Sequence, residues 1–282
     1  MSNPLISIII PCFNGGADLP ETLASLEGQT FKDVEILVVD DGSTDSATLA
    51  YLQSLPPAIR RIRQENKGLP AARNAGMRQA RGQFLLPLDC DDRLEPSFLA
   101  EALQLLQARP DAAFVFAQMR LTGELQGVTR KSYNPFVQLF LNQLPYCLLM
   151  RKSAWESLGG YDETFRSGYE DWEFNIRLSA AGLHGVGLDA ALFIYRVRSG
   201  GMLNSLSRQS HAQLWQAIQN KHPQLYRLCA MRALRCKWRA VPLAYPAPLL
   251  FGLLAAHRLL PFSWFNALYA RLLAFSAARR AG

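Results

Sequence analysis

Short apolar segments rich in β-branched residues alternate with helix-like segments through the first 120 residues. Strands are expected at 5–10, 34–39, 59–63, 84–88 and 112–117, with helices at about 19–27, 44–54, 70–80 and 96–107. Strands that are apolar on both faces are typical of a mostly parallel sheet covered by helices on both sides. We therefore predict an α/β fold, and we expect further strands near 147–150 and 191–197 and a helix at about 170–181.

Polar clusters follow three of these strands at the point where each strand ends. They are Phe13-Asn14-Gly15-Gly16, Asp40-Asp41-Gly42-Ser43 and Asp89-Cys90-Asp91-Asp92. Ligands of open parallel sheets bind at the carboxyl ends of the strands, so these clusters predict a site there. The chain contains neither GxGxxG nor GxxxxGK[ST], so a Rossmann or P-loop phosphate site lacks support.

The acidic triplet Asp89, Asp91 and Asp92 follows a buried strand. Three carboxylates within four residues repel one another unless a cation neutralises them, and Mg²⁺ or Mn²⁺ prefers such oxygen ligands. The alternative is a solvated acidic turn that caps the helix near Pro96. The position at a strand end, beside a second acidic strand end, favours a metal site.

Two further acidic pairs have both a functional and an ordinary interpretation. Asp40-Asp41 could hydrogen-bond the base or ribose of a nucleotide, or could belong to a common Asp-Gly turn. Glu170-Asp171 opens a helix, where acidic residues are stabilised by the helix dipole. A carboxylate in that position, beside aromatic residues, can instead act as a general base.

Charge is distributed unevenly along the chain. Residues 1–189 carry 17 basic and 23 acidic residues, whereas residues 190–282 carry 13 basic residues and no acidic one. Such a basic segment favours an anionic partner, either a membrane surface or nucleic acid. The five cysteines are odd in number and widely spaced, which favours a reducing compartment. The apolar run at 5–10 lacks a basic region before it, so we interpret it as a strand and not as a signal peptide.

The last third of the chain, residues 204–282, is predicted to be a helical extension. Basic residues cluster at 227–239, and a strongly apolar stretch runs from 240 to 256. If 262–275 is helical, Phe262, Trp264 and Phe265 share one side and Asn266 faces away. These features favour attachment to an anionic membrane surface through 227–275. Packing against the first domain or homodimer formation is the alternative, and nucleic-acid binding explains the apolar surface poorly.

Five motifs carry a resemblance to a known family. They are SIIIPCFNGG, LVVDDGSTD, NKGLPAARNAG, FLLPLDCDD and GYEDWEFNIRL, and their order and spacing resemble those of the bacterial GT-A family 2 glycosyltransferases over residues 5–200. The resemblance implies a catalytic domain at 1–203 with the GT-A fold. It also implies inverting transfer of a sugar from a nucleotide diphosphate donor to an acceptor hydroxyl, with Mn²⁺ or Mg²⁺ as the cofactor.

The resemblance also assigns roles to residues at the strand ends. Phe13, which is commonly Tyr in the family, would stack on the donor base, and Asp41 would hydrogen-bond that base. Asp89 would contact the ribose or sugar. Asp91 would be the principal metal ligand, with Asp92 in support.

Roles in the second half of the domain follow from the same resemblance. Asp171 would be the base that deprotonates the acceptor, and Arg196 and Arg198 would be candidates to reach the diphosphate. The family analogy suggests a saccharide or glycolipid acceptor in cell-surface polysaccharide synthesis, and a cytoplasmic protein bound peripherally to the inner face of the membrane.

Two other functions are compatible with a nucleotide-binding sheet. A sugar-phosphate nucleotidyltransferase would need a basic, glycine-rich loop after the first strand, and FNGGADLPET contains no basic residue. A non-catalytic nucleotide-sugar-binding module would have no reason to keep the acidic triplet together with Glu170-Asp171. Both are therefore weaker interpretations than a glycosyltransferase.

Overall fold

The computed structural model of the chain describes residues 3–198 and 210–281, and it describes side chains as far as residue 271. The chain divides into two compact units. The N-terminal unit comprises Met1–Tyr133, Leu144–Arg166 and Glu170–Val197, and the C-terminal unit comprises Asn134–Gln143, Ser167–Tyr169 and Arg198–Gly282. The domain boundary predicted at 203 lies outside the described residues.

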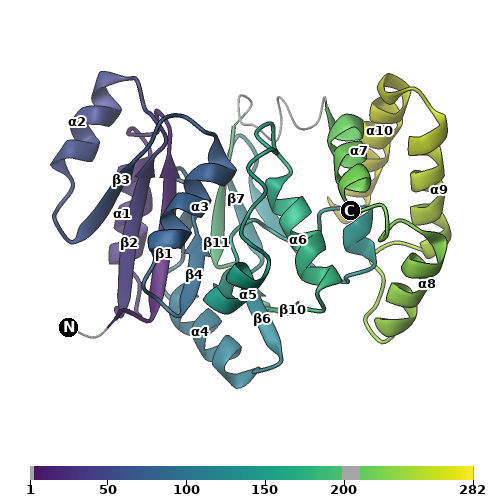
Figure 1. Ribbon diagram of the computed structural model, residues 1–282, viewed down its shortest axis with the longest axis horizontal. Coiled ribbons are helices and arrows are strands. Elements are labelled where there is room, and N and C mark those ends of the chain that lie inside the picture. Colours follow the sequence, from purple (N-terminus) through teal and green to yellow (C-terminus); the bar gives the residue numbers. More distant parts are fainter. Residues whose placement is uncertain (1–2, 199–209, 282) are drawn as a thin grey trace. The chain divides into compact units, whose positions relative to one another are not determined.

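The N-terminal unit is built on a seven-stranded sheet of order β10-β6-β9-β4-β1-β2-β3 (Figure 1). Its strands are β1 (Ile6–Cys12), β2 (Val34–Asp40), β3 (Ile59–Arg63), β4 (Phe84–Pro87), β6 (Ala112–Phe116), β9 (Leu149–Arg151) and β10 (His184–Gly187). Strand β9 is antiparallel to both of its neighbours, whereas β4, β1, β2 and β3 are parallel to one another. The predicted mostly parallel α/β sheet is confirmed.

A smaller sheet of order β5-β11-β7-β8 belongs to the same unit. Its strands are β5 (Arg93–Leu94), β7 (Met119–Gly123), β8 (Gly127–Thr129) and β11 (Phe193–Val197). Strand β5 begins directly after the acidic triplet and pairs with β11. The triplet is therefore held between the two sheets of this unit.

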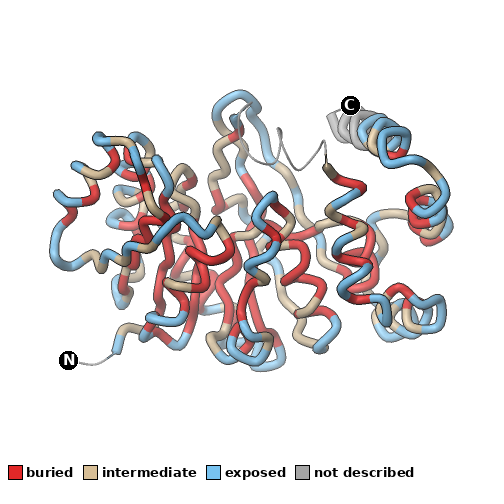
Figure 2. The backbone as a smooth tube through the Cα atoms, turned by 45° about the horizontal axis from the view of Figure 1, so that its top comes forward, coloured by how far each residue is buried: buried red, intermediate tan, exposed pale blue. Residues whose placement is uncertain are grey.

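Helices cover both faces of the large sheet because its central strands are apolar on both sides. All seven residues of β1 are buried, with Ile8 and Ile10 in the core beneath α1 (Leu19–Glu27), α2 (Ser46–Ser54) and α4 (Phe98–Ala108). Ile9 lies in the opposite core beneath α3 (Leu69–Gln79), α5 (Lys152–Ser157) and α6 (Glu170–Ala180). Figure 2 shows the buried strands between partly exposed helices.

Helix α3 approaches the sheet closely at Gly76. A Cβ atom at this position would lie only 2.5 Å from Cγ2 of Ile9 and 3.0 Å from Cγ2 of Val39. Glycine is therefore the residue that allows this packing. The close approach fixes α3, and with it Arg73, above the carboxyl ends of β1 and β2.

The C-terminal unit is helical. It contains a 3₁₀ turn (Val137–Leu139) and the helices α7 (His211–Lys221), α8 (Leu228–Lys237), α9 (Ala247–Leu259) and α10 (Phe262–Ala281). Trp215 of α7 is fully buried, and its Nε1 donates a hydrogen bond to the carbonyl of Leu139 at 3.1 Å. Within the described residues, no helix combines the length and the apolar character needed to cross a membrane.

Candidate active site

The three polar clusters meet at one edge of the large sheet. Strands β1 and β2 run parallel in register, so Cys12 pairs with Asp40 at their ends. The backbone N–H of Leu88 donates to the carbonyl of Ile9 at 2.9 Å, which continues the β4–β1 pairing up to the acidic triplet. The structure thus brings together the strand ends that the sequence indicated.

Asp41 is buried and organises the loop that leads from β3 to α3. Its Oδ1 accepts hydrogen bonds from Nε2 of Gln64 at 2.7 Å and from the N–H of Lys67 at 2.9 Å, and its Oδ2 accepts one from the N–H of Gly68 at 2.8 Å. Gly42, with φ of 77°, turns the chain away directly after it. In this structure both Asp41 oxygens therefore hold the protein's own loop.

Phe13 presents an open aromatic ring directly after the end of β1. Its exposed fraction is 50%, although the residue directly before it, Cys12, is buried. The following residue, Asn14, ties the turn to the β2 cluster, because its Oδ1 accepts the N–H groups of Thr44 and Asp45 at 2.8 and 3.1 Å. An exposed ring on a fixed turn can stack on a planar ligand.

Arg73 of α3 connects the strand ends to helix α6. Only 1% of it is exposed, its Nη2 lies 2.7 Å from Oδ1 of Asp89, and its Nη1 lies 2.6 Å from Oε1 of Glu170. The guanidinium also lies 4.7 Å from the ring centre of Tyr146 and 5.7 Å from that of Tyr161. One buried cation therefore joins the acidic triplet to the start of the helix that carries Asp171.

Burial and neighbouring charges shift the pKa values of this cluster in opposite directions. Burial disfavours the Arg73 cation, but Asp89 and Glu170 outweigh it, so the pKa of Arg73 lies well above its usual value. Burial raises the pKa of Glu170 to about 7, an effect that Arg73 opposes and Asp171 reinforces. A buried carboxyl whose pKa is raised toward neutrality beside a specific charged partner is typical of a functional site.

Asp92 is turned into the protein. It is 1% exposed, its Oδ1 accepts the backbone N–H of Arg196 at 2.7 Å, and its Oδ2 accepts the hydroxyl of Tyr146 at 2.6 Å. Burial, followed by the charges of Asp91 and Asp89, raises its pKa well above the usual range. Thr22 donates to the carbonyl oxygens of both Cys90 and Asp92 at 2.8 Å. These contacts shape the loop that presents Asp91.

Asp91 is partly exposed, whereas its neighbour Asp92 is buried. In the part of the chain that the structure describes, no three Asp, Glu, His or Cys side chains are placed to hold a metal ion between them. Mg²⁺ and Mn²⁺ are commonly bound through one or two protein carboxylates together with substrate phosphates and water. The donor set here, an accessible carboxylate on a loop fixed from beneath, fits that mode of binding.

Asp171 lies in the first turn of α6, next to Glu170. The residue is partly exposed, and its Oδ1 accepts the N–H of Trp172 at 2.7 Å. Trp172 itself is buried and anchors this turn of the helix, whereas Asp171 keeps partial access to solvent. This arrangement suits a carboxylate that must reach a substrate.

The two arginines suggested as phosphate ligands differ in their surroundings. The guanidinium of Arg196 lies 3.0 Å from Oδ1 of Asp18 and also contacts Oε2 of Glu21. Its side chain thus pairs with α1 and the turn before it, while its backbone holds Asp92. Arg198 is exposed and follows the end of β11.

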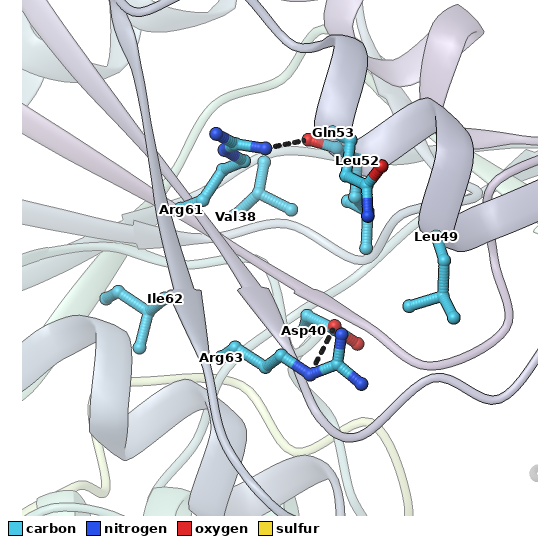
Figure 3. Close-up of a pocket in the computed structure, with 8 residues that line it drawn as sticks. All are labelled: Val38, Asp40, Leu49, Leu52, Gln53, Arg61, Ile62 and Arg63. Carbon is cyan, nitrogen blue, oxygen red and sulfur yellow. Dashed lines mark hydrogen bonds and ion pairs between the residues drawn. The ribbon is translucent and has the colours of Figure 1, made fainter.

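A pocket of about 330 Å³ is lined by residues of α2 and of the strands β2 and β3 (Figure 3). Leu49 and Leu52 of α2 line it opposite Asp40, and Arg63 closes one end through a 3.6 Å ion pair with Asp40. None of Asp89, Asp91 and Asp171 lines this pocket. This pocket is therefore separate from the candidate metal ligand and the candidate base.

Sequence reasoning missed two members of the cluster, Arg73 and Tyr146. Arg73 lies in NKGLPAARNAG, a motif that was recognised without a role for its arginine. Tyr146 lies 54 residues after Asp92 in a stretch without a recognisable motif. An arginine within a helix of small apolar residues was the only sequence signal of a buried cation.

Comparison with known proteins assigns the family. The sequence model described as glycosyl transferase family 2 matches residues 7–174. A Haemophilus influenzae protein described as an uncharacterized glycosyltransferase is 29% identical over 184 residues, covering 62% of each chain. Chondroitin synthase of Escherichia coli is 32% identical over 187 residues, covering 64% of this chain and 27% of that protein. The chain thus spans less than two thirds of the length of these relatives.

Solved structures share the fold at low sequence identity. S. aureus TarS 1-349 in complex with UDP-GlcNAc aligns with a TM-score of 0.62 and 21% identity, covering 76% of this chain and 65% of that one. Mannosyltransferase PcManGT from Pyrobaculum calidifontis, in complex with GDP-Man and Mn2+, aligns with a TM-score of 0.60 and 19% identity over 98% of this chain and 87% of the other. The fold is therefore GT-A, and because the family model matches more than half of the sequence, the chain belongs to glycosyl transferase family 2.

Proposed function

We propose that this protein transfers a sugar, with inversion, from a nucleotide diphosphate-sugar to an acceptor hydroxyl. The observation that carries the proposal is the pair of ion pairs from buried Arg73 to Asp89 and Glu170. It joins the loop suited to a donor diphosphate and the helix suited to a base into one site. Family membership supports the same reaction class, and the neighbours solved with UDP-GlcNAc and GDP-Man support a nucleotide-sugar donor.

Donor binding is assigned to the strand ends. Phe13 stacks on the base, and the turn that Asp41 organises forms the edge of the base pocket. Asp89, held by Arg73, faces the ribose or sugar. Asp91 would hold a divalent ion, with the Asp92 loop in support, and such an ion would supply positive charge to neutralise the diphosphate. Arg196 and Arg198 are both candidates to meet phosphate, and the side chain of Arg196 is held by an ion pair with Asp18.

Acceptor activation is assigned to Asp171. The acceptor hydroxyl lies on the side of the sugar opposite the diphosphate, and Asp171 takes its proton as the new bond forms. Arg73 offsets the negative charges of Glu170 and Asp89 and holds both carboxylates in place through hydrogen bonds. In this way the base is aligned with the donor. In-line attack of this kind inverts the anomeric centre.

The nucleotide is identified by thermal stabilisation. UDP and GDP are added in turn with Mn²⁺, with Mg²⁺ and with EDTA, and the melting temperature is followed. The proposal predicts that one nucleoside diphosphate raises the melting temperature only with a divalent ion. If neither nucleotide raises the melting temperature under any of these conditions, the proposal is contradicted.

The C-terminal unit supports attachment to an anionic membrane surface. Of the nine exposed large hydrophobic residues among the described positions, six belong to this unit: Leu228, Leu249, Leu259, Phe262, Trp264 and Leu268. The basic residues of 227–239 are exposed in and around α8. Aromatic side chains beside basic ones are typical of interfacial helices. Such attachment fits a saccharide or glycolipid acceptor used in cell-surface polysaccharide synthesis, and one relative is described as O-antigen biosynthesis protein RfbC.

A further inference from the structure

The three residues that precede the helix of Asp171 belong to the C-terminal unit. Ser167–Tyr169 group with that unit, although the chain on both sides of them belongs to the N-terminal unit. Gly168 has φ of 108° and Tyr169 has φ of 67°. The second value lies in a region that residues other than glycine rarely adopt. Such a conformation persists where surrounding contacts hold it, so the contacts of Tyr169 must be considered.

Tyr169 is held by a buried histidine of α7. Its hydroxyl oxygen lies 2.8 Å from Nδ1 of His211, and His211 is only 1% exposed. The imidazole is fixed in turn, because it stacks on Tyr269 with ring centres 3.7 Å apart and planes at 10°. Burial lowers the pKa of His211 to about 3, so the ring stays neutral over the physiological range. The tyrosine hydroxyl is thus attached to a rigid aromatic cluster.

We propose that Tyr169 and His211 are positioning residues for the base, because their hydrogen bond fixes the left-handed backbone from which the first turn of α6 emerges. Asp171 is two residues beyond Tyr169, so rotation of that backbone moves its carboxylate. The inference rests on the proposed function, and it adds two residues that position the base without touching the substrate. A displacement of about 1 Å at a reacting group lowers rates about 10²-fold.

The test replaces each partner in the full-length protein. Tyr169→Phe and His211→Phe keep the rings and remove the hydrogen bond, and each is expected to lower kcat about 10–10²-fold with donor KM unchanged within about twofold. Because both variants remove the same bond, the double variant should be no slower than the slower single one. His211→Asn places an amide near the position of Nδ1 and should recover part of kcat.

Tyr133→Phe is the matched control. The Tyr133 hydroxyl lies 2.8 Å from Oγ of Ser179, near the other end of α6, so this variant also removes a part-buried tyrosine contact to that helix. Its kcat should equal that of the wild type. A kcat of Tyr169→Phe equal to that of the control, or a change confined to donor KM, overturns the proposal.

Amide hydrogen exchange separates this inference from the proposed function because it needs no activity. Tyr169→Phe should speed exchange over residues 170–175, and Tyr133→Phe should leave that segment unchanged. Equal exchange in the two variants overturns the positioning role. A wild type without transfer activity overturns the proposed function, and faster exchange in Tyr169→Phe alone would still show that this bond holds the start of α6.

Discussion

Replacing Arg73 with methionine tests the buried cluster at the centre of the site. The substitution keeps most of the side-chain volume and removes the cation that faces Asp89 at 2.7 Å and Glu170 at 2.6 Å. Removing one partner of a buried ion pair typically destabilises a protein by about 3–5 kcal/mol, because a buried charge remains uncompensated. We expect a loss of that size in the free energy of unfolding at pH 8.

The loss should depend on pH. The pKa of Glu170 is raised to about 7 by burial even beside Arg73, and without Arg73 it should rise further. A carboxyl with a raised pKa in the folded state stabilises most below its unfolded value, and that stability is lost as pH rises through its folded value. The destabilisation of Arg73→Met should therefore be smaller at pH 5.5 than at pH 8.

Urea unfolding followed by circular dichroism measures both effects. Arg78→Met is the control, because Arg78 is on the same helix and makes an exposed ion pair with Glu163 at 3.3 Å, which is worth about 0–1 kcal/mol. Adding Glu170→Gln to Arg73→Met should restore part of the stability at pH 8. A loss no larger than that of Arg78→Met, or a loss that is the same at both pH values, would refute this reasoning.

Three further predictions concern catalysis and attachment. Asp91→Asn should abolish transfer and the metal-dependent stabilisation by a nucleoside diphosphate while the far-ultraviolet circular dichroism is unchanged; near-normal turnover, or full wild-type activity in chelator, contradicts the metal role. Asp171→Asn should lower kcat by about 10²–10⁴-fold with donor affinity unchanged, and loss of donor binding with little loss of turnover would move this residue to a donor-holding role. The wild type should sediment with anionic liposomes, less so at high salt, and charge reversal at Arg232, Arg235 and Lys237 should weaken this binding. A full-length protein that ignores anionic vesicles at low salt would instead have a C-terminal unit for packing or dimerisation.

Local patterns were sufficient to predict six of the seven strands of the large sheet, all but β10, and the edge where the polar clusters meet. The strands that end at Cys12, Asp40 and Pro87 are mostly apolar, and the polar clusters that follow them are expected from the architecture of parallel sheets. The helix at Glu170–Ala180 was also predicted within one residue, because its apolar spacing and its acidic first turn are both local signals.

Contacts between distant segments could not be predicted from the sequence. Arg73 and Glu170 are 97 residues apart, and Tyr146 and Asp92 are 54 apart, so no local periodicity links them. The expected orientation of α10 was wrong in part. Trp264 is 69% exposed whereas Phe265 is buried, and Asn266, which was expected to face away, accepts a hydrogen bond from the N–H of Ala212 at 2.9 Å. A polar residue that bonds to a neighbouring helix cannot be distinguished from a solvated one by spacing alone.

The most direct test of the account is the release of nucleoside diphosphate from nucleotide-sugars. The full-length protein is incubated with UDP- and GDP-linked sugars in the presence of Mn²⁺, and the wild type is compared with Asp91→Asn and with a chelator-treated sample. The account predicts that at least one donor is consumed by the wild type alone, with the nucleoside diphosphate as the released product. Consumption that is equal in all three samples, or no consumption of any donor by the wild type when a saccharide acceptor mixture is supplied, would contradict it.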